Sequence, residues 1–152
     1  MDKIEYFMID TDSEFYNEAV KLRYRVFFES SHSSMDAIYD EIENKSFHIV
    51  AVRNNCVLGY IRLTEQGGNG LVSQFVVEEN ARGTALIGKK LIDMVEQKAR
   101  EDNLSCLYGE IRLHVEKAAK IYGFEVYDEI VYSKKTGIPH KRIYKSLSEK
   151  DK

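Results

Sequence analysis

FVVEENARGTALIGKKLI, residues 75–92, is an apolar run followed by a short loop and then by apolar residues spaced three to four positions apart. The run at 71–77 predicts a strand, and the spacing from 86 to about 100 predicts an amphipathic helix with basic residues in its first turns. A helix N-terminus carries N–H groups without intrahelical partners and a positive partial charge, which together favour an anion such as phosphate. The stretch therefore predicts a strand–loop–helix unit that either binds an anion at the helix start or only presents a solvated basic face.

Two glycines in this unit, Gly83 and Gly88, would let a pyrophosphate approach the backbone closely. The unit matches neither of two common phosphate-binding motifs. Gly83 and Gly88 have the glycine spacing of a P-loop, but Lys90 stands where that motif needs serine or threonine, and the dinucleotide-binding GxGxxG pattern is missing. An anion site here would be of another kind.

The rest of the chain predicts strands and helices around this unit. Short apolar runs bounded by turn residues predict strands at 4–9, 48–53, 57–63, 104–111, 125–132 and 141–147, with Asn54 and Asn55 forming a hairpin turn. Helices are predicted after the start signal at 11–13 and at 115–121, where Gly123 can cap, with a further short helix at 35–40. The order predicts one α+β domain over 1–148, with a mixed, mostly antiparallel sheet of six to seven strands flanked by helices, and a polar tail at 149–152.

The composition is that of an ordinary globular protein, with 152 residues, 43% hydrophobic and 31% charged, and a formal net charge of −3. This charge argues against a dedicated nucleic-acid binder. No apolar run is long enough to span a membrane and the N-terminus has no apolar signal segment, so we expect a cytoplasmic protein. Cys56 and Cys106 are too few for a disulfide framework and lack metal-ligand spacing, so we expect both to lie in the core and no metal to be bound.

The 75–92 stretch resembles motif A of the GNAT acyltransferase superfamily, in which a segment of the form V-x-x-x-x-R-G-x-G-I-G-x-x-L cradles the pyrophosphate of acetyl-CoA. The predicted order of elements is similar to the GNAT order through nearly the whole chain. Other pieces resemble the ElaA-like branch: LRYRVF at 22–27, Asp36 with Asp40, SFH at 46–48, VLGYIRL at 57–63, GFEV at 123–126 and GIPH at 137–140. The R-x-x-F and Y-D pieces of the chain also look like acyl-homoserine-lactone synthases, which share this fold.

The chain departs from the family pattern in two places. The loop before Gly88 is one residue longer than usual, and apolar residues stand where glycines are usual, at Ala85, Leu86 and Ile87. Many GNAT enzymes also place a tyrosine, the general acid to the leaving thiolate, four residues before the Gly-Phe pair. Ala119 stands at that position, and Tyr122 lies directly before the pair instead. Tyr122 is therefore either a shifted acid or a packing residue.

The resemblance implies that an acyl-CoA, most simply acetyl-CoA, enters an opening between the parallel strands at 71–77 and 104–111, which splay apart at the centre of the sheet. Main-chain groups of the first strand, the loop and the first helical turn would bind it. The cofactor-binding residues implied in this way are Phe75, Val76, Val77, Arg82, Gly83, Thr84, Ala85, Ile87, Gly88 and Lys89.

The resemblance further implies that a primary amine attacks the acyl thioester directly, without an acyl-enzyme. A carboxylate near the thioester would help to remove the amine proton. The residues predicted for catalysis are Glu110 and, after it, Glu78 with its neighbour Glu79 as bases, and Tyr122 as acid. The residues predicted to face the substrate are Arg112, His114 and Asp40, while His140 is expected to pack at the cleft rim. For each of these side chains the alternative is an ordinary surface or structural role.

The acceptor would be an amine of a small molecule or peptide. The segment 29–45 has five acidic residues against Lys45, so it either favours a cationic amine or is a solvated acidic loop. The same fold could instead serve as an acyl-CoA-binding module without turnover, or as a longer-chain acyltransferase. No nucleic-acid or membrane partner is expected, and the C-terminal strands offer an edge that could pair in a homodimer.

Overall fold

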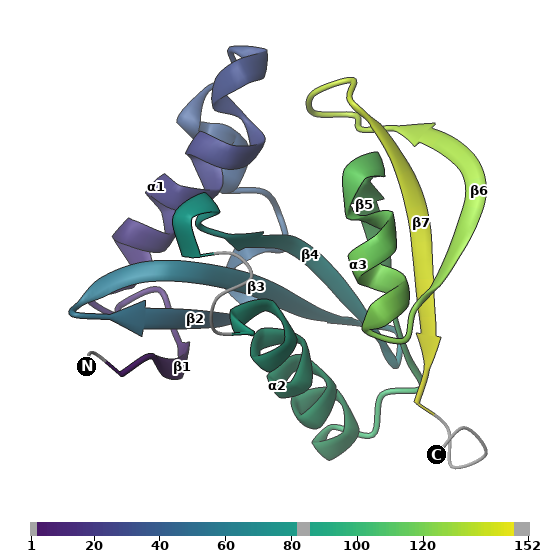
Figure 1. Ribbon diagram of the computed structural model, residues 1–152, viewed down its shortest axis with the longest axis horizontal. Helices are drawn as coiled ribbons and strands as arrows, with labels where there is room; N and C mark the ends of the chain where they lie inside the picture. The colour runs from purple at the N-terminus through teal and green to yellow at the C-terminus, as the bar shows by residue number, and fades with distance from the viewer. Residues whose placement is uncertain (1–2, 82–85, 148–152) are drawn as a thin grey trace.

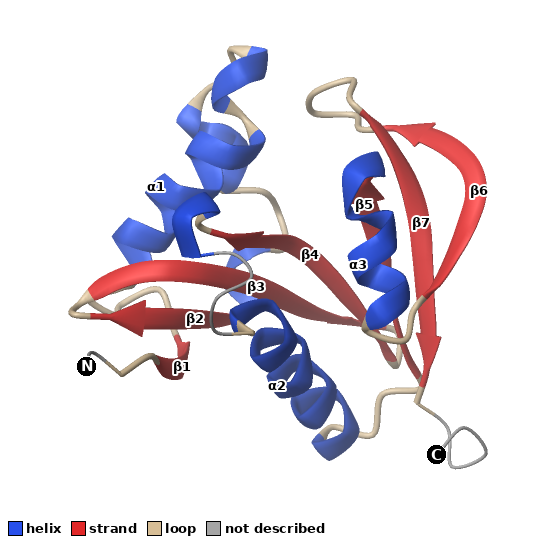
Figure 2. Cartoon of the chain, in the orientation of Figure 1, coloured by secondary structure: helices blue, strands red, loops and turns tan. Residues whose placement is uncertain are grey.

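The computed structural model describes residues 3–81 and 86–147, whose strands form one seven-stranded sheet in the order β1-β2-β3-β4-β5-β7-β6 (Figures 1 and 2). The strands are β1 (Glu5–Ile9), β2 (Phe47–Arg53), β3 (Cys56–Gln66), β4 (Asn69–Val77), β5 (Cys106–Arg112), β6 (Glu125–Tyr132) and β7 (Pro139–Ser146). The α-helices are α1 (Tyr16–Phe27), α2 (Ile87–Glu101) and α3 (Glu116–Ile121). Short 3-10 turns are η1 (Glu29–Ser31), η2 (Met35–Ile38), η3 (Glu43–Lys45), η4 (Glu79–Ala81) and η5 (Leu113–Val115).

The predicted α+β fold is confirmed, including the mixed sheet and the order of its elements. Asn54 and Asn55 form the β2–β3 turn with φ of 52° and 63°, the left-handed pair that a two-residue hairpin requires. The short helix predicted at 35–40 is a 3-10 turn, η2, one of three in the segment 29–45. The expectation that both cysteines lie in the core was wrong for Cys56, which is exposed beside the hairpin turn, whereas Cys106 is buried.

The strands β4 and β5 form the parallel pair of the sheet, and they separate after a short contact. Their ladder has three residue pairs, Gly70↔Leu107, Leu71↔Tyr108 and Val72↔Gly109. At its last pair the backbones approach so closely that a Cβ on Gly109 would lie 2.3 Å from the carbonyl oxygen of Val72. The predicted splay is therefore present, and Gly109 marks the point where it begins.

Helices cover the two faces of the sheet separately (Figure 2). Alternate residues of the central strands point to opposite sides, as strand geometry requires. Val50 and Tyr60 pack with α1, whereas Ile49 and Ile61 pack in the cluster that contains residues of α2 and α3. We call these the α1 face and the α2 face. Among the residues that the structure describes, no helix has both the length and the hydropathy needed to cross a lipid bilayer.

Candidate active site

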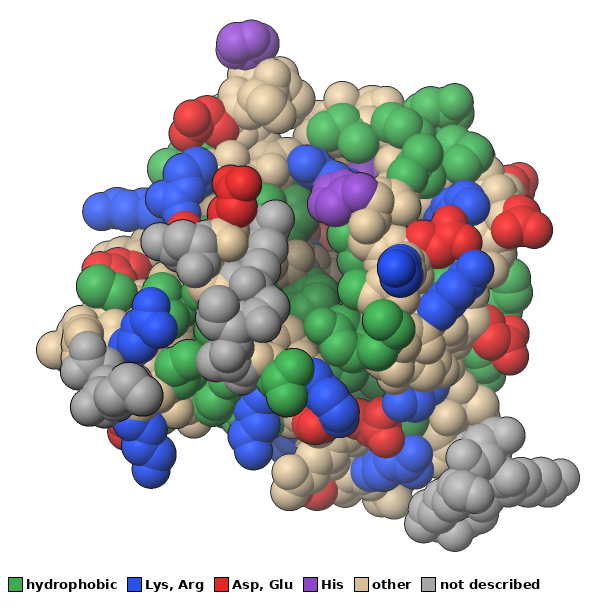
Figure 3. All heavy atoms as spheres, in the orientation of Figure 1, with side chains coloured by type: hydrophobic (Ala, Val, Ile, Leu, Met, Phe, Trp, Pro, Cys, Tyr) green, Lys and Arg blue, Asp and Glu red, His purple; other side chains and the backbone are tan. Residues whose placement is uncertain are grey.

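A β-bulge in β4 lies just beyond its last pair with β5. Tyr60 pairs with Val76 and Arg62 with Ser73, so two residues of β4, Gln74 and Phe75, stand opposite the one residue between Tyr60 and Arg62. Gln74 has φ of 56°, a left-handed conformation that is uncommon for a residue with a side chain. A bulge bends its strand and increases the local twist. The bulge thus accompanies the separation of β4 from β5, and Figure 3 shows the surface hollowed between the two halves, with hydrophobic side chains in the hollow.

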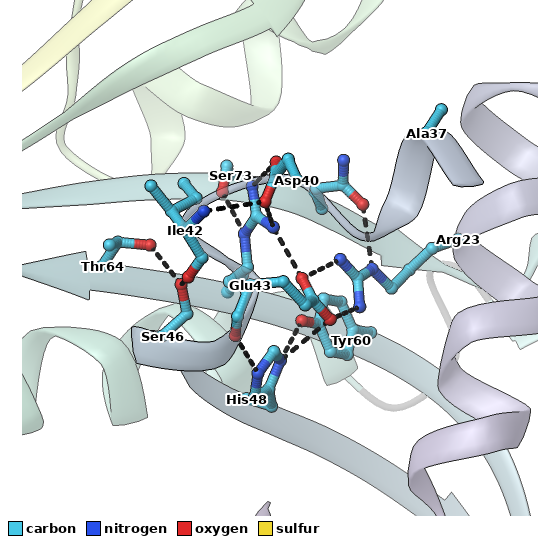
Figure 4. A network of polar contacts seen from close by, with 12 residues as sticks. Arg23, Ala37, Asp40, Ile42, Glu43, Ser46, His48, Tyr60, Thr64 and Ser73 are labelled. Carbon is cyan, nitrogen blue, oxygen red and sulfur yellow. Dashed lines mark hydrogen bonds and ion pairs between the residues drawn. The ribbon is translucent and has the colours of Figure 1, made fainter. Parts of the chain in front are cut away.

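A buried polar network on the α1 face holds this bulge from behind (Figure 4). Nε of Arg23, on α1, donates to the side-chain oxygen of Gln74 at 2.9 Å. The other two nitrogens of Arg23 donate to both carboxylate oxygens of Glu43 at 2.7 Å. Arg62, on β3, donates to the same carboxylate at 2.7 Å. We call Arg23, Glu43 and Arg62, with Gln74, the bulge network.

The three charged members of the bulge network are almost wholly buried, with 0% of Arg23, 2% of Glu43 and 3% of Arg62 exposed. Burial alone would raise the pKa of Glu43, but the hydrogen bonds and positive charges around it, above all those of Arg23, lower that pKa to about 2. His48 lies beside the network and contacts the Tyr60 hydroxyl at 2.5 Å, and burial lowers its pKa. The carboxylate therefore stays ionised at neutral pH while the imidazole beside it favours the neutral form.

Asp40, predicted to face the substrate, is held between two cations. Both its oxygens accept hydrogen bonds from Arg62 at 3.1 Å, and Lys135 lies 2.9 Å from the second oxygen. Burial would raise the pKa of Asp40, but hydrogen bonds and charges from these two residues lower it. Lys135 also donates to the carbonyl of Ala37 at 3.1 Å. Since Lys135 lies in the turn between β6 and β7, it joins the C-terminal hairpin to η2 and to Asp40.

The helix α2 begins near the end of β4, where that strand has separated from β5. It starts at Ile87, after Leu86, which has φ of 53° and is 72% exposed. In its first turn the N–H of Lys90 donates to the carbonyl of Leu86 at 3.1 Å. The N–H groups of the three residues before Lys90 point out of the helix end by the geometry of a helix. The side chain of Lys89 pairs with Asp93 one turn later, at 3.0 Å.

Four of the predicted cofactor-binding residues, Arg82, Gly83, Thr84 and Ala85, lie outside the described residues. Of the others, Phe75, Val76 and Val77 form the end of β4, and Ile87, Gly88 and Lys89 form the first turn of α2. The structure therefore brings the end of β4 and the first turn of α2 close together: a Cβ on Gly88 would lie 3.2 Å from the ring of Phe75.

Tyr122 lies against both of these elements. Its ring packs edge-to-face on Phe75 with ring centroids 6.2 Å apart. A Cβ on Gly88 would lie 2.5 Å from the Tyr122 hydroxyl oxygen, so the Tyr122 side chain would have to shift if a larger residue replaced this glycine on α2. Burial raises the pKa of Tyr122, partly opposed by the charge of Lys89, so the phenol keeps its proton at neutral pH. Ala119, at the usual tyrosine position, is buried in the core on the α2 face.

Three more of the predicted site residues lie on β5 or directly after it. Glu110 is exposed on β5, opposite Arg142 of β7. Arg112 reaches from the end of β5 to α1, where it donates to the carbonyl of Phe27 at 3.0 Å. His114 is exposed on η5.

Two more predicted residues have contacts within the chain. Glu78 forms an ion pair with Arg25 of α1. His140, opposite Arg112 in the ladder, donates from Nδ1 to the carbonyl of Ile138 at 2.8 Å. Across the described ranges, no group of three or more His, Cys, Asp or Glu side chains is placed to hold a metal ion.

Sequence reasoning missed three residues that shape this site. Gly109 could have been found, because a glycine inside an apolar strand often marks a close approach of another backbone. Glu43 and Lys135 carried no local signal, since their partners lie up to 27 and 98 residues away in the chain.

The chain matches the model of the acetyltransferase (GNAT) family over residues 12–124. A search of curated proteins found no match. Among solved structures it is similar to an acyl-CoA N-acyltransferase from Pseudomonas aeruginosa, with 22% identity and a TM-score of 0.76 over 95% of this chain and 100% of that one. ElaA from Escherichia coli is 20% identical, with a TM-score of 0.76 over 93% of this chain and 99% of that one.

A third solved structure, an aminoglycoside 6'-N-acetyltransferase complexed with coenzyme A, is 13% identical, with a TM-score of 0.75 over 95% of this chain and 97% of that one. At sequence identities this low, the structural similarity shows a shared fold and nothing more specific. The family match, in contrast, covers most of the chain and includes the bulged strand β4, the start of α2 and the strand β5. Together with the splayed parallel pair, it shows that the chain belongs to the acetyltransferase (GNAT) family.

Proposed function

We propose that the protein is an acyl-CoA-dependent N-acyltransferase, which transfers an acetyl group from acetyl-CoA to a primary amine of a small molecule or peptide. The observation that carries this proposal is the opening between β4 and β5, which begins at Gly109 and lies next to the start of α2. Membership of the family supports the choice of cofactor, as does the coenzyme A bound to one structural neighbour, the aminoglycoside 6'-N-acetyltransferase.

The chain's own groups fit an acyl-CoA in two respects. Beyond Val72 the β4 backbone is not paired with β5, so its polar groups can bond an extended pantetheine chain. The start of α2 offers first-turn amides and the positive end of a helix dipole for a pyrophosphate. We assign the pantetheine to Phe75, Val76 and Val77, and the pyrophosphate to residues 82–85 with Ile87, Gly88 and Lys89.

Acetyl-CoA would supply an activated thioester. In the transfer a C–N bond forms to the amine, the C–S bond breaks, the amine loses a proton and the CoA thiolate gains one. The amine has a pKa near about 10 in water, so a base must help to remove its proton. Glu110, exposed on the α1 face beside the gap, is assigned as that base, with Glu78 second because Arg25 already pairs with it. Tyr122, whose phenol keeps its proton, is assigned as the donor to the thiolate.

Two measurements test the function. Acetyl-CoA should bind in a calorimetric titration, and CoA thiol should be released when a panel of primary amines is added. An absence of heat and of a thermal shift at millimolar acetyl-CoA would refute the proposal. Arg82→Ala should weaken acetyl-CoA binding by about 1–3 kcal/mol, the worth of one charge-assisted contact.

The variant Glu110→Gln separates catalysis from binding. It should lower turnover and leave the affinity for acetyl-CoA unchanged, because the glutamine keeps the shape but cannot take a proton. Glu125→Gln, on an exposed position of β6, is the matched control and should keep the wild-type rate. A wild-type rate in Glu110→Gln would remove Glu110 from the mechanism.

The buried Ala119 favours a second candidate, an acyl-CoA-binding module without turnover. In that case acetyl-CoA would bind and no amine in the panel would release thiol. The same titration and the same thiol assay distinguish the two candidates.

A further inference from the structure

Arg112 is a partly buried cation at the end of β5 with an incomplete set of partners. One terminal nitrogen donates to the carbonyl of Phe27 at 3.0 Å, and the guanidinium carbon lies 5.5 Å from the centre of the Phe27 ring. Its Nε is buried and has no hydrogen-bond partner, and it stands alone in this respect among the buried side-chain nitrogens and oxygens of residues 3–81 and 86–147. A buried donor without an acceptor costs free energy, so its retention calls for an explanation.

Arg112 also differs from the buried arginines Arg23 and Arg62 in its charge balance. Arg23 and Arg62 both bind the carboxylate of Glu43. Within the described part of the chain, no carboxylate forms an ion pair with Arg112, and burial lowers its pKa with no opposing contribution. A guanidinium that is taken out of water without a counter-ion is unfavourable unless an anion from outside completes it.

Arg112 lies close to Glu110, the proposed base, and so close to the place where the amine of the acceptor would bind. Because side chains alternate along a strand, Glu110 and Arg112 share one face of β5, and the contact with Phe27 shows that this is the α1 face. Their Cα atoms are about 6.5–7 Å apart, from the rise of two strand residues. One small acceptor molecule could therefore place its amine at Glu110 and, a few bonds away, its carboxylate at Arg112.

We propose that Arg112 binds the carboxylate of the acceptor, which makes the acceptor an amino acid whose amine faces Glu110. The planar guanidinium suits a carboxylate because it offers parallel N–H donors, including the unpartnered Nε. The charge of the segment 29–45 agrees with this class of acceptor, since Asp40 and Glu43, two of its five acidic residues, already pair with cations of the chain. This inference rests on the proposed function and specifies its substrate class.

The experiment compares each common amino acid with its own amide, which keeps the amine and loses the carboxylate charge. Thiol release from acetyl-CoA is measured for both, and the ratio of their kcat/KM values is the readout. The wild-type protein should prefer at least one amino acid over its amide by about 10-fold or more. Arg112→Met should remove this preference and bring the ratio to about 1, because the preference reflects one charge-assisted bidentate contact, worth about 10-fold or more.

Two further variants make the test specific. Arg112→Lys keeps the positive charge but loses the planar pair of N–H donors that can bind both carboxylate oxygens. Its ratio should therefore fall between those of the wild type and Arg112→Met. Arg142→Met removes an arginine of β7 whose side chain is 57% exposed and pairs with Glu129, and it should keep the wild-type ratio. An equal loss in Arg142→Met would show a general charge effect and overturn the assignment to Arg112.

The outcomes separate this inference from the proposed function. If acetyl-CoA does not bind, the function itself fails and the inference fails with it. If amides and other amines that lack a carboxylate are acetylated as well as amino acids are by the wild-type protein, the function stands and the carboxylate site is refuted. This last comparison needs no variant, so it holds even if Arg112→Met does not fold.

Discussion

Replacing Glu43 by glutamine would leave two buried arginines beside a neutral side chain. Arg23 and Arg62 each donate to Glu43 at 2.7 Å, and at most 3% of any of the three residues is exposed. Breaking a buried ion pair by removing one partner costs about 3–5 kcal/mol. The pKa of Glu43 gives a similar magnitude, because its fall from 4.5 to about 2 corresponds to about 3 kcal/mol. We expect Glu43→Gln to lose about 3 kcal/mol of unfolding free energy at pH 7.

The pH dependence gives this prediction a second readout. The folded-state pKa of Glu43 is lower than its unfolded-state value, so the stabilisation is complete above pH 4.5 and is lost as the pH falls toward 2. The difference between the wild type and Glu43→Gln should therefore shrink to less than about half its pH 7 value by pH 3.

Urea unfolding followed by circular dichroism at pH 7 and pH 3 measures both differences. Glu125→Gln, an exposed carboxylate on β6, is the control and should differ little from the wild type at either pH. A loss below about 1 kcal/mol at pH 7, or a loss that is the same at pH 3, would refute the view that Glu43 holds the bulge network together as a buried anion.

Three other predictions concern the backbone of the site. Gly109→Ala should prevent the last β4–β5 pair from forming, because its Cβ would meet a backbone oxygen at 2.3 Å, and chemical denaturation should show a loss of several kcal/mol, about 2 or more. Gly88→Ala should lower the melting temperature, because its Cβ would lie 2.5 Å from the Tyr122 hydroxyl oxygen. Adding Tyr122→Phe, which removes that oxygen, should recover part of the loss. If the double variant shows no recovery, the steric strain does not come from the Tyr122 hydroxyl. Gln74→Gly should be more stable than Gln74→Ala by about 1 kcal/mol, because φ of 56° suits glycine and both variants lose the bond to Arg23; equal stabilities would contradict the strained bulge.

Much of the fold could be predicted because its signals are local. Alternating and continuous apolar runs marked the strands, the spacing of Ile87, Leu91 and Val95 marked α2, and the Asn54-Asn55 pair marked a hairpin. The splay was expected only through the resemblance of the 75–92 stretch to a known motif. The structure confirms it in the three-residue ladder of β4 and β5.

The candidate site could be predicted only in part, because its geometry depends on distant residues. The bulge network joins α1, η3, β3 and β4, and no sequence pattern shows that Arg23 would find both Glu43 and Gln74. That Nε of Arg112 has no hydrogen-bond partner among the described residues is likewise visible only in the structure. The roles proposed for Glu110 and Tyr122 stay predictions, which the measurements above would test.

The bridge from Lys135 to η2 connects the C-terminal hairpin to the segment 29–45 through a charged side chain. One flexible side chain, bonded to Asp40 and to the carbonyl of Ala37, makes this connection without any backbone hydrogen bond. Breaking these two hydrogen bonds would leave the ladders of the sheet intact, because Lys135 lies in the turn between β6 and β7. Because the contact between Lys135 and Asp40 is partly exposed and ionic, rising salt should weaken it.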